Sequence, residues 1–145
     1  MKVSEPVTKE DFEKYFRLRY EILRKPWSQP MGSEKDLLEN TAVHAMIKTD
    51  SGEVIACGRL QMNSPGEAQV RSMAVHPDYR GNNYGGLVLN YLEQKAKEKG
   101  AEKIILQARE KALSFYKRNG YELVEKTHLM FGEVQHYLMQ KFLKP

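Results

Sequence analysis

The residues best suited to bind a charged ligand form one glycine-rich stretch, Arg80-Gly81-Asn82-Asn83-Tyr84-Gly85-Gly86. It follows a short apolar run, 70–75, and precedes an amphipathic run, 84–99, an order that predicts a strand, a turn and a helix. At such a turn the first N–H groups of the helix have no partner within the helix, and the helix dipole adds partial positive charge. The sequence therefore predicts a phosphate or pyrophosphate site, and with it a phosphorylated cofactor.

Two common phosphate-binding loops do not match this stretch. A P-loop ends in Gly-Lys followed by Ser or Thr, and no such sequence follows these glycines. A dinucleotide-binding fingerprint requires G-x-G-x-x-G, but the G-x-G part is absent. The alternative to a binding loop is a tight turn between strand and helix that binds nothing.

The stretch resembles the [Arg/Gln]-x-x-Gly-x-[Gly/Ala] loop of the GNAT superfamily of N-acetyltransferases, which holds the pyrophosphate of acetyl-CoA. Arg80 and Gly85 match the outer positions, whereas Asn83 stands where the family usually has glycine. Asn tolerates a left-handed backbone better than other non-glycine residues, so this departure is compatible with the loop. About 30 residues later, 112–121 resembles the family's A-x-x-F-Y-x-x-x-G-[F/Y] segment.

This resemblance covers residues 70–124 without a gap. The later sequence is similar to the ElaA-like branch of the family at residues 107–110, His136 and Met139. It implies one GNAT N-acetyltransferase domain over 1–145, with an α/β fold. In that fold a mixed central sheet has two splayed parallel strands and helices on both faces. The cofactor implied is acetyl-CoA, with coenzyme A as product.

Apolar spacing and turn residues predict the order of the elements. The strand–helix–strand unit 70–107 requires a parallel pair joined by a right-handed crossover. We expect helices from Thr8 to before Pro26, from Ser33 to about Asn40, and over 84–99 and 110–118, with strands over 42–48, 53–62, 68–75, 103–107, 121–126 and 134–142.

The chemistry that the resemblance implies is transfer of an acyl group from a thioester to an amine. The departing thiolate, with a reference pKa of about 8.5, leaves more readily when it is protonated. Tyr116, which the resemblance places beside the sulfur of CoA, is the candidate donor because a phenol is neutral near pH 7. The alternative is that Tyr116 is a core residue on the same helix face as Ala112 and Phe115.

By resemblance, main-chain groups near Met73 and Val75 hold the pantetheine arm, and an N–H near Val75 stabilises the oxyanion. Phe115 is expected to contribute mainly packing, and most of the family has Asn where this chain has Arg109. The expected cofactor-binding residues are Met73, Ala74, Val75, Arg80, Gly81, Asn82, Asn83, Tyr84, Gly85, Gly86, Arg109, Phe115 and Tyr116.

The general base is the least determined part of the site. His136 is the first candidate, because it titrates near neutral pH and lies on a late strand that lines the acceptor side in this family. Glu67, Glu110, His44 and His128 compete with it, and water could relay the proton instead. No His/Cys cluster has zinc spacing, so we expect no metal.

The acceptor pocket of this family is usually built by the first two helices and their loop, which nominates Arg24, Trp27 and Gln29. These three residues only weakly favour a free small amine over a protein lysine as the acceptor. Two other classes remain open: a non-catalytic acyl-CoA sensor, which would need no proton donor, and a nucleic-acid-binding module, which would need clustered basic and aromatic residues.

Composition fits a small enzyme, and the single cysteine suits the reducing cytoplasm. We expect a monomer or homodimer. The 145 residues match one domain, and no apolar run approaches the roughly 20 residues of a membrane span or the core of a signal peptide. The single cysteine, Cys57, lies in an apolar run and is expected to be buried. The net charge of +4 could attract nucleic acid and fits CoA equally well. The basic residues alternate with acidic ones, a pattern that is typical of a solvated helix face rather than of a nucleic-acid-binding surface.

Overall fold

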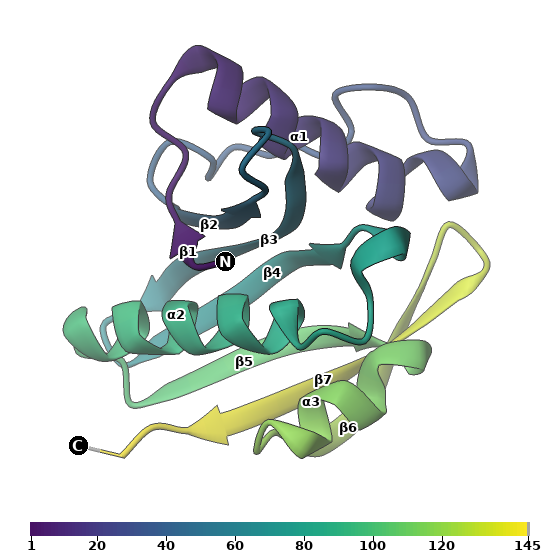
Figure 1. Ribbon diagram of the computed structural model, residues 1–145. Helices are drawn as coiled ribbons and strands as arrows, with labels where there is room; N and C mark the ends of the chain where they lie inside the picture. The colour runs from purple at the N-terminus through teal and green to yellow at the C-terminus, as the bar shows by residue number, and fades with distance from the viewer. Residues whose placement is uncertain (145) are drawn as a thin grey trace.

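A seven-stranded mixed sheet forms the centre of the computed structural model, which describes residues 1–144 (Figure 1). The strand order across the sheet is β1-β2-β3-β4-β5-β7-β6. The strands are β1 (Val3–Ser4), β2 (Val43–Lys48), β3 (Val54–Ser64), β4 (Glu67–Val75), β5 (Lys103–Arg109), β6 (Glu122–Met130) and β7 (Val134–Phe142). The helices are α1 (Lys9–Leu23), α2 (Tyr84–Glu98) and α3 (Leu113–Arg118), with short 3₁₀ turns η1 (Lys25–Trp27), η2 (Pro77–Tyr79) and η3 (Glu110–Ala112).

Helices cover both faces of the sheet, as expected. Met46 and Cys57 pack with α1, whereas Ile47 and Ala56, their neighbours along β2 and β3, belong to the cluster that packs with α2. Successive side chains of a strand point to opposite faces, so α1 and α2 lie on opposite sides of the sheet. Cys57 is fully buried, as expected, and this burial raises the pKa of its thiol to about 12, which disfavours the reactive thiolate.

The two long helices begin and end at the signals in the sequence. Thr8 forms a capping box with Asp11, and α1 ends at Leu23, before Pro26. The second long helix, α2, follows Asn83 and ends at Glu98, and Gly100 has a φ of +85° just beyond it.

The predicted helix from Ser33 to Asn40 is absent, and this segment consists of turns. Two buried arginines from other elements hold it. Arg19 of α1 donates to both carboxylate oxygens of Glu39 at 2.9 and 3.0 Å, and Arg59 of β3 donates to Glu39 and to Asp36. These long-range ion pairs outweigh the local helix propensity.

Several other elements begin or end at residues that differ from the expected bounds. The helix expected from 110 begins as the 3₁₀ turn η3, and only Leu113–Arg118 is α-helical. Strand β6 extends to Met130, beyond the expected end at Lys126, because it pairs with β7 to the tip of the hairpin. Strand β1 is only two residues long and carries no pattern that sequence alone reveals.

Strands β4 and β5 form the expected parallel pair but separate after three positions, from Glu67–Lys103 to Gln69–Ile105. Near this point the register of β4 against β3 shifts, and Ser72 has a φ of +58°, which marks a β-bulge. Beyond the bulge, β4 leans away from β5 while β5 stays paired with β7. The resulting gap positions the candidate site.

Candidate active site

Two cavities open into the gap between β4 and β5 and meet within it. The larger has a volume of about 1060 Å³ and the smaller about 330 Å³. Met73, Arg109, Ala112 and Tyr116 line both. A group bound at this junction is therefore accessible from either cavity, which is the arrangement that a two-substrate reaction needs.

The larger cavity collects most of the residues expected to bind the cofactor. Asn82 does not line it, and its side-chain amide instead donates to the carbonyl of Tyr79 at 3.2 Å. Gly86 is buried beneath the turn and does not line it either. The expected residues that line this cavity are Met73, Ala74, Val75, Arg80, Gly81, Asn83, Tyr84, Gly85, Arg109, Phe115 and Tyr116.

The glycine turn leaves the start of α2 open. Asn83 precedes the helix with φ +61° and ψ 22°, and its side chain makes no capping hydrogen bond. A Cβ atom on Gly86 would collide with the side-chain Oδ1 of Asn83, so Gly86 makes room for the asparagine that replaces the usual glycine. The first N–H groups of α2 remain available for an anion, and the dipole of this 15-residue helix favours one.

Gly85 brings the turn close to the second motif. A Cβ atom at this position would lie 3.3 Å from the ring of Phe115 and 3.5 Å from Val75. The ring of Phe115 meets that of Tyr116 edge to face, with 5.0 Å between centroids. The glycine turn and the Phe-Tyr pair are thus parts of one cavity wall.

Tyr116 differs from the other buried tyrosines of the protein. The hydroxyl of Tyr121 donates to Glu93 at 2.8 Å, and that of Tyr15 lies 2.8 Å from Nδ1 of His44. The hydroxyl of Tyr116 has no hydrogen-bond partner in residues 1–144, although the residue is only 7% exposed. Burial raises the pKa of Tyr116 above its usual value, against the opposing charge of Arg109, so the phenol is protonated at neutral pH.

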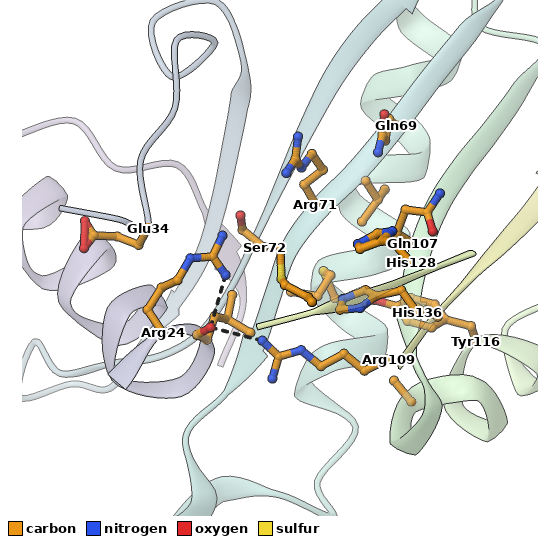
Figure 2. Close-up of a pocket in the computed structure, with 16 residues that line it drawn as sticks. Arg24, Glu34, Gln69, Arg71, Ser72, Gln107, Arg109, Tyr116, His128 and His136 are labelled. Atoms are coloured by element: carbon orange, nitrogen blue, oxygen red, sulfur yellow. Dashed lines mark hydrogen bonds between the residues drawn. The ribbon is translucent and has the colours of Figure 1, made fainter. Parts of the chain in front are cut away.

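His136 lies opposite Arg109 in the register of β7 against β5. Its Nδ1 atom is 2.9 Å from the carbonyl oxygen of Val134, so Nδ1–H donates and Nε2 carries the free lone pair. The ring stacks on that of His128 at 4.5 Å. Burial is the main cause that lowers the pKa of His136, and His128 adds to it. Figure 2 shows His136 and Tyr116 on one side of the smaller cavity.

The other candidates for the base are spread over the molecule. His44 belongs to the α1 face, where its Nε2 lies 2.7 Å from the carbonyl of Glu39, and Glu67 pairs with Lys103; neither lines a cavity. Glu110 is an exposed residue on the wall of the larger cavity, and His128 lines the smaller one.

The three expected acceptor residues do not share one cavity. Arg24 lines the smaller cavity, Trp27 lines the larger, and Gln29 lines neither. The side-chain amide of Gln29 donates to the carbonyl of Trp27 at 3.1 Å, which fixes the loop. The ring of Trp27 stacks on Phe131 at the β6–β7 tip and carries the guanidinium of Arg109 at 4.4 Å.

Sequence reasoning missed several residues of the smaller cavity, notably Arg71 and Gln69 on β4 and Gln107 on β5. They alternate along strands that were expected, but nothing in the sequence shows which face of each strand meets the gap. Phe131 was missed too, because it reaches Trp27 only through the long β6–β7 hairpin.

Within residues 1–144, no three His, Cys, Asp or Glu side chains gather closely enough to hold a metal ion. None of the helices in the same part of the chain combines the length and the apolar character that crossing a membrane requires.

The acetyltransferase (GNAT) family model matches residues 9–121. The chain is 28% identical to an uncharacterized N-acetyltransferase, YjcF, of Bacillus subtilis, over 97% of this chain and 99% of that protein. It is 33% identical over 75% of its length to an amino-acid acetyltransferase of Aliivibrio fischeri, of which it spans only 24%.

Solved structures share the fold at low sequence identity. An aminoglycoside 6′-N-acetyltransferase complexed with coenzyme A superimposes with a TM-score of 0.82 at 16% identity, over 100% of this chain and 98% of that one. Escherichia coli ElaA superimposes with a TM-score of 0.78 at 17% identity, over 97% of both chains.

Proposed function

This chain belongs to the acetyltransferase (GNAT) family and is an acyl-CoA-dependent acyltransferase, and we propose that it transfers an acetyl group from acetyl-CoA to a primary amine of a small molecule. We further propose that the amine attacks the thioester directly in a ternary complex. The observation that carries this proposal is the junction of the two cavities at Tyr116, which lines both and whose hydroxyl has no hydrogen-bond partner in residues 1–144.

The larger cavity suits the substrate acetyl-CoA in shape and charge. The open N-terminus of α2 and the guanidinium of Arg80 offer donors for the pyrophosphate. The stretch of β4 beyond the bulge, with Met73 and Val75, has main-chain groups on its β5 side that no strand pairs, and these suit the amides of the pantetheine arm. The acetyl group would then lie near Tyr116.

The residues at the junction divide the proton transfers between them. Nε2 of His136 accepts the proton that the amine loses as its nitrogen bonds to the acetyl carbon. A main-chain N–H of β4 near Val75 donates to the oxyanion. Tyr116 donates its proton to the sulfur as the C–S bond breaks, giving the acetylated amine and coenzyme A.

A covalent enzyme intermediate on cysteine is disfavoured. Cys57, the only cysteine of the chain, is fully buried on the α1 side of the sheet and donates to the carbonyl of Ser72 at 3.4 Å. Its raised pKa also removes the thiolate that such a step needs. Direct attack is therefore the simpler route.

The size of the smaller cavity, about 330 Å³, supports a small-molecule amine rather than a folded protein. The amino-acid acetyltransferases among the relatives suggest one class, and the aminoglycoside acetyltransferase among the fold neighbours suggests another, of opposite charge.

A screen of acetyl-CoA turnover across amino acids, polyamines, aminoglycosides and simple alkylamines, read by release of free thiol, tests the proposal. At least one class should raise the rate with saturable kinetics. Calorimetry with acetyl-CoA runs in parallel. Tight binding without thiol release from any amine would contradict the proposal and favour an acyl-CoA sensor.

A further inference from the structure

We propose that the acceptor carries a carboxylate close to its amine, as a small amino acid does, and that Arg24, Arg109 and Arg71 in the smaller cavity recognise that carboxylate. This inference rests on the proposed acetyl transfer and names the substrate class of the same site. Its basis is the charge of the cavity wall and the absence, within residues 1–144, of a carboxylate paired with Arg24 or Arg109.

The wall of the smaller cavity is strongly basic. Three arginines and one carboxylate, that of Glu34, line it, so these four side chains together carry a formal charge of +2. The carboxylate of Glu34 is already engaged, because it accepts the N–H of Gly32 at 2.8 Å. A cationic acceptor would meet uncompensated positive charge here, whereas an anionic one would neutralise it.

Arg24 and Arg109 have no carboxylate within 4.0 Å in residues 1–144. Arg24 donates through Nε to the carbonyl of Ser33 at 3.1 Å, and both arginines donate to the carbonyl of Leu23 (Figure 2). Burial lowers the pKa of each guanidinium, and each also feels a neighbouring arginine. Within this part of the chain, neither guanidinium therefore has a directly paired carboxylate that would offset the cost of taking its charge out of water.

The two arginines that are almost completely buried, Arg19 and Arg59, do have carboxylate partners. Each has a side chain 1% exposed, and their terminal nitrogens lie 2.8–2.9 Å from carboxylate oxygens of Glu39 and Asp36. Arg24 and Arg109, which line the cavity, thus differ from the arginines of the core in having no paired carboxylate among the described residues of the protein. An incoming carboxylate has two planar oxygens that suit guanidinium groups.

Arg71 completes the basic wall at its more exposed side. Its Nη1 lies 3.7 Å from the carboxylate of Asp36, which Arg59 already holds at 2.9 Å. The side chain of Arg71 is 41% exposed, so it is neither buried nor fully neutralised. It can turn toward an anion in the cavity without breaking the core network.

Two of these three arginines, Arg24 and Arg71, are separate from the cavity that holds the proposed pyrophosphate site. Arg24 and Arg71 line only the smaller cavity, and the glycine turn lines only the larger. Arg109 lies at the junction, next to Tyr116 and opposite His136 in the strand register. A carboxylate held by Arg24 and Arg109 would leave the neighbouring amine near His136, where the proposed base can deprotonate it.

The test compares kcat/KM for L-α-amino acids with that for their carboxamides, which keep the amine and lose the negative charge. Spermidine is assayed in parallel as a cationic acceptor. If the carboxylate makes one hydrogen bond to a charged arginine, kcat/KM for the amino acid should exceed that for its carboxamide by about 10- to 100-fold. Arg24→Gln and Arg71→Gln should each reduce this preference, while acetyl-CoA affinity, measured by calorimetry, stays unchanged in Arg71→Gln.

Arg17→Gln is the matched control, because Arg17 is an exposed arginine of α1 outside both cavities and its variant should keep the preference. Equal or faster turnover of carboxamides or spermidine would overturn this inference alone. A preference for carboxylates that Arg24→Gln and Arg71→Gln leave intact would also overturn it. Absence of thiol release with every amine would contradict the proposed function and this inference together.

Discussion

Arg24 and Arg109 donate hydrogen bonds to one acceptor, the main-chain carbonyl oxygen of Leu23, at 3.1 and 3.2 Å. One arginine follows α1 and the other ends β5, so the two halves of the chain meet at this carbonyl. The shared contact places two positive charges at the edge of the smaller cavity. It also ties the end of α1 to the strand that carries the junction of the cavities.

Tyr116→Phe should lower kcat while leaving the fold intact. The hydroxyl has no hydrogen-bond partner in residues 1–144, so its removal costs little stability. General acid catalysis contributes about 10²- to 10⁴-fold, and the loss should lie near the lower end because a thiolate leaves readily. Acetyl-CoA affinity should change little. The measurement is kcat with an established acceptor, under conditions where chemistry limits turnover.

Tyr121→Phe is the matched control for that variant. Its hydroxyl donates to Glu93 at 2.8 Å, so the substitution removes a hydrogen bond to a charged group and should cost about 1.5–3 kcal/mol of unfolding free energy. Its kcat should stay close to that of the parent. If Tyr116→Phe lost stability and kept its kcat, Tyr116 would be a packing residue.

The pH dependence of kcat/KM should carry the signature of His136. Because burial lowers its pKa below the usual 6.5, the free base is present at pH 7 and is lost as the pH falls through the lowered value. His136→Gln should remove this acid limb and leave the limb due to the acceptor amine. Tyr116 should add no limb up to about pH 10, since its pKa is raised above the ordinary value of a phenol. An unchanged acid limb in His136→Gln would assign the base elsewhere.

Gly86→Ala should weaken acetyl-CoA binding through Asn83. The added methyl group collides with Oδ1 of Asn83, so this exposed side chain must move aside, which disturbs the turn rather than the core. The double variant Asn83→Gly/Gly86→Ala should regain both stability and affinity, because glycine removes the collision and accepts the positive φ. Calorimetry and thermal unfolding of the two variants check this. A double variant no better than Gly86→Ala would show that the collision is not the cause.

Glu39→Gln should destabilise the protein strongly. It removes the carboxylate shared by Arg19 and Arg59, whose side chains are each 1% exposed, and breaking such a buried pair costs about 3–5 kcal/mol. Urea unfolding measures the change. Glu13→Gln, an exposed position on α1, is the control and should shift stability by less than about 0.5 kcal/mol.

Local signals explain which elements the sequence predicts well. The start of α1 at Thr8, the glycine turn and the start of α2 depend on residues within a few positions of one another. The 32–41 segment depends instead on Arg19 and Arg59, which lie in elements before and after it, so its turns escaped prediction.

The same distinction applies to the site. Tyr116 and the glycine turn lie in contiguous motifs, and the structure brings both to one cavity. Arg71 and Arg109 come from different strands and line one cavity because β4 and β5 are no longer paired beyond Gln69 and Ile105. No local pattern marks that separation, so the basic wall became visible only in three dimensions.

Direct attack in a ternary complex is tested most directly by initial rates of thiol release, with acetyl-CoA and an active amine varied together. Direct attack requires saturation in both substrates, intersecting double-reciprocal lines and an acetylated amine that mass spectrometry detects. Parallel lines would indicate a covalent acetyl-enzyme, which the fully buried Cys57 does not favour, and would contradict direct attack.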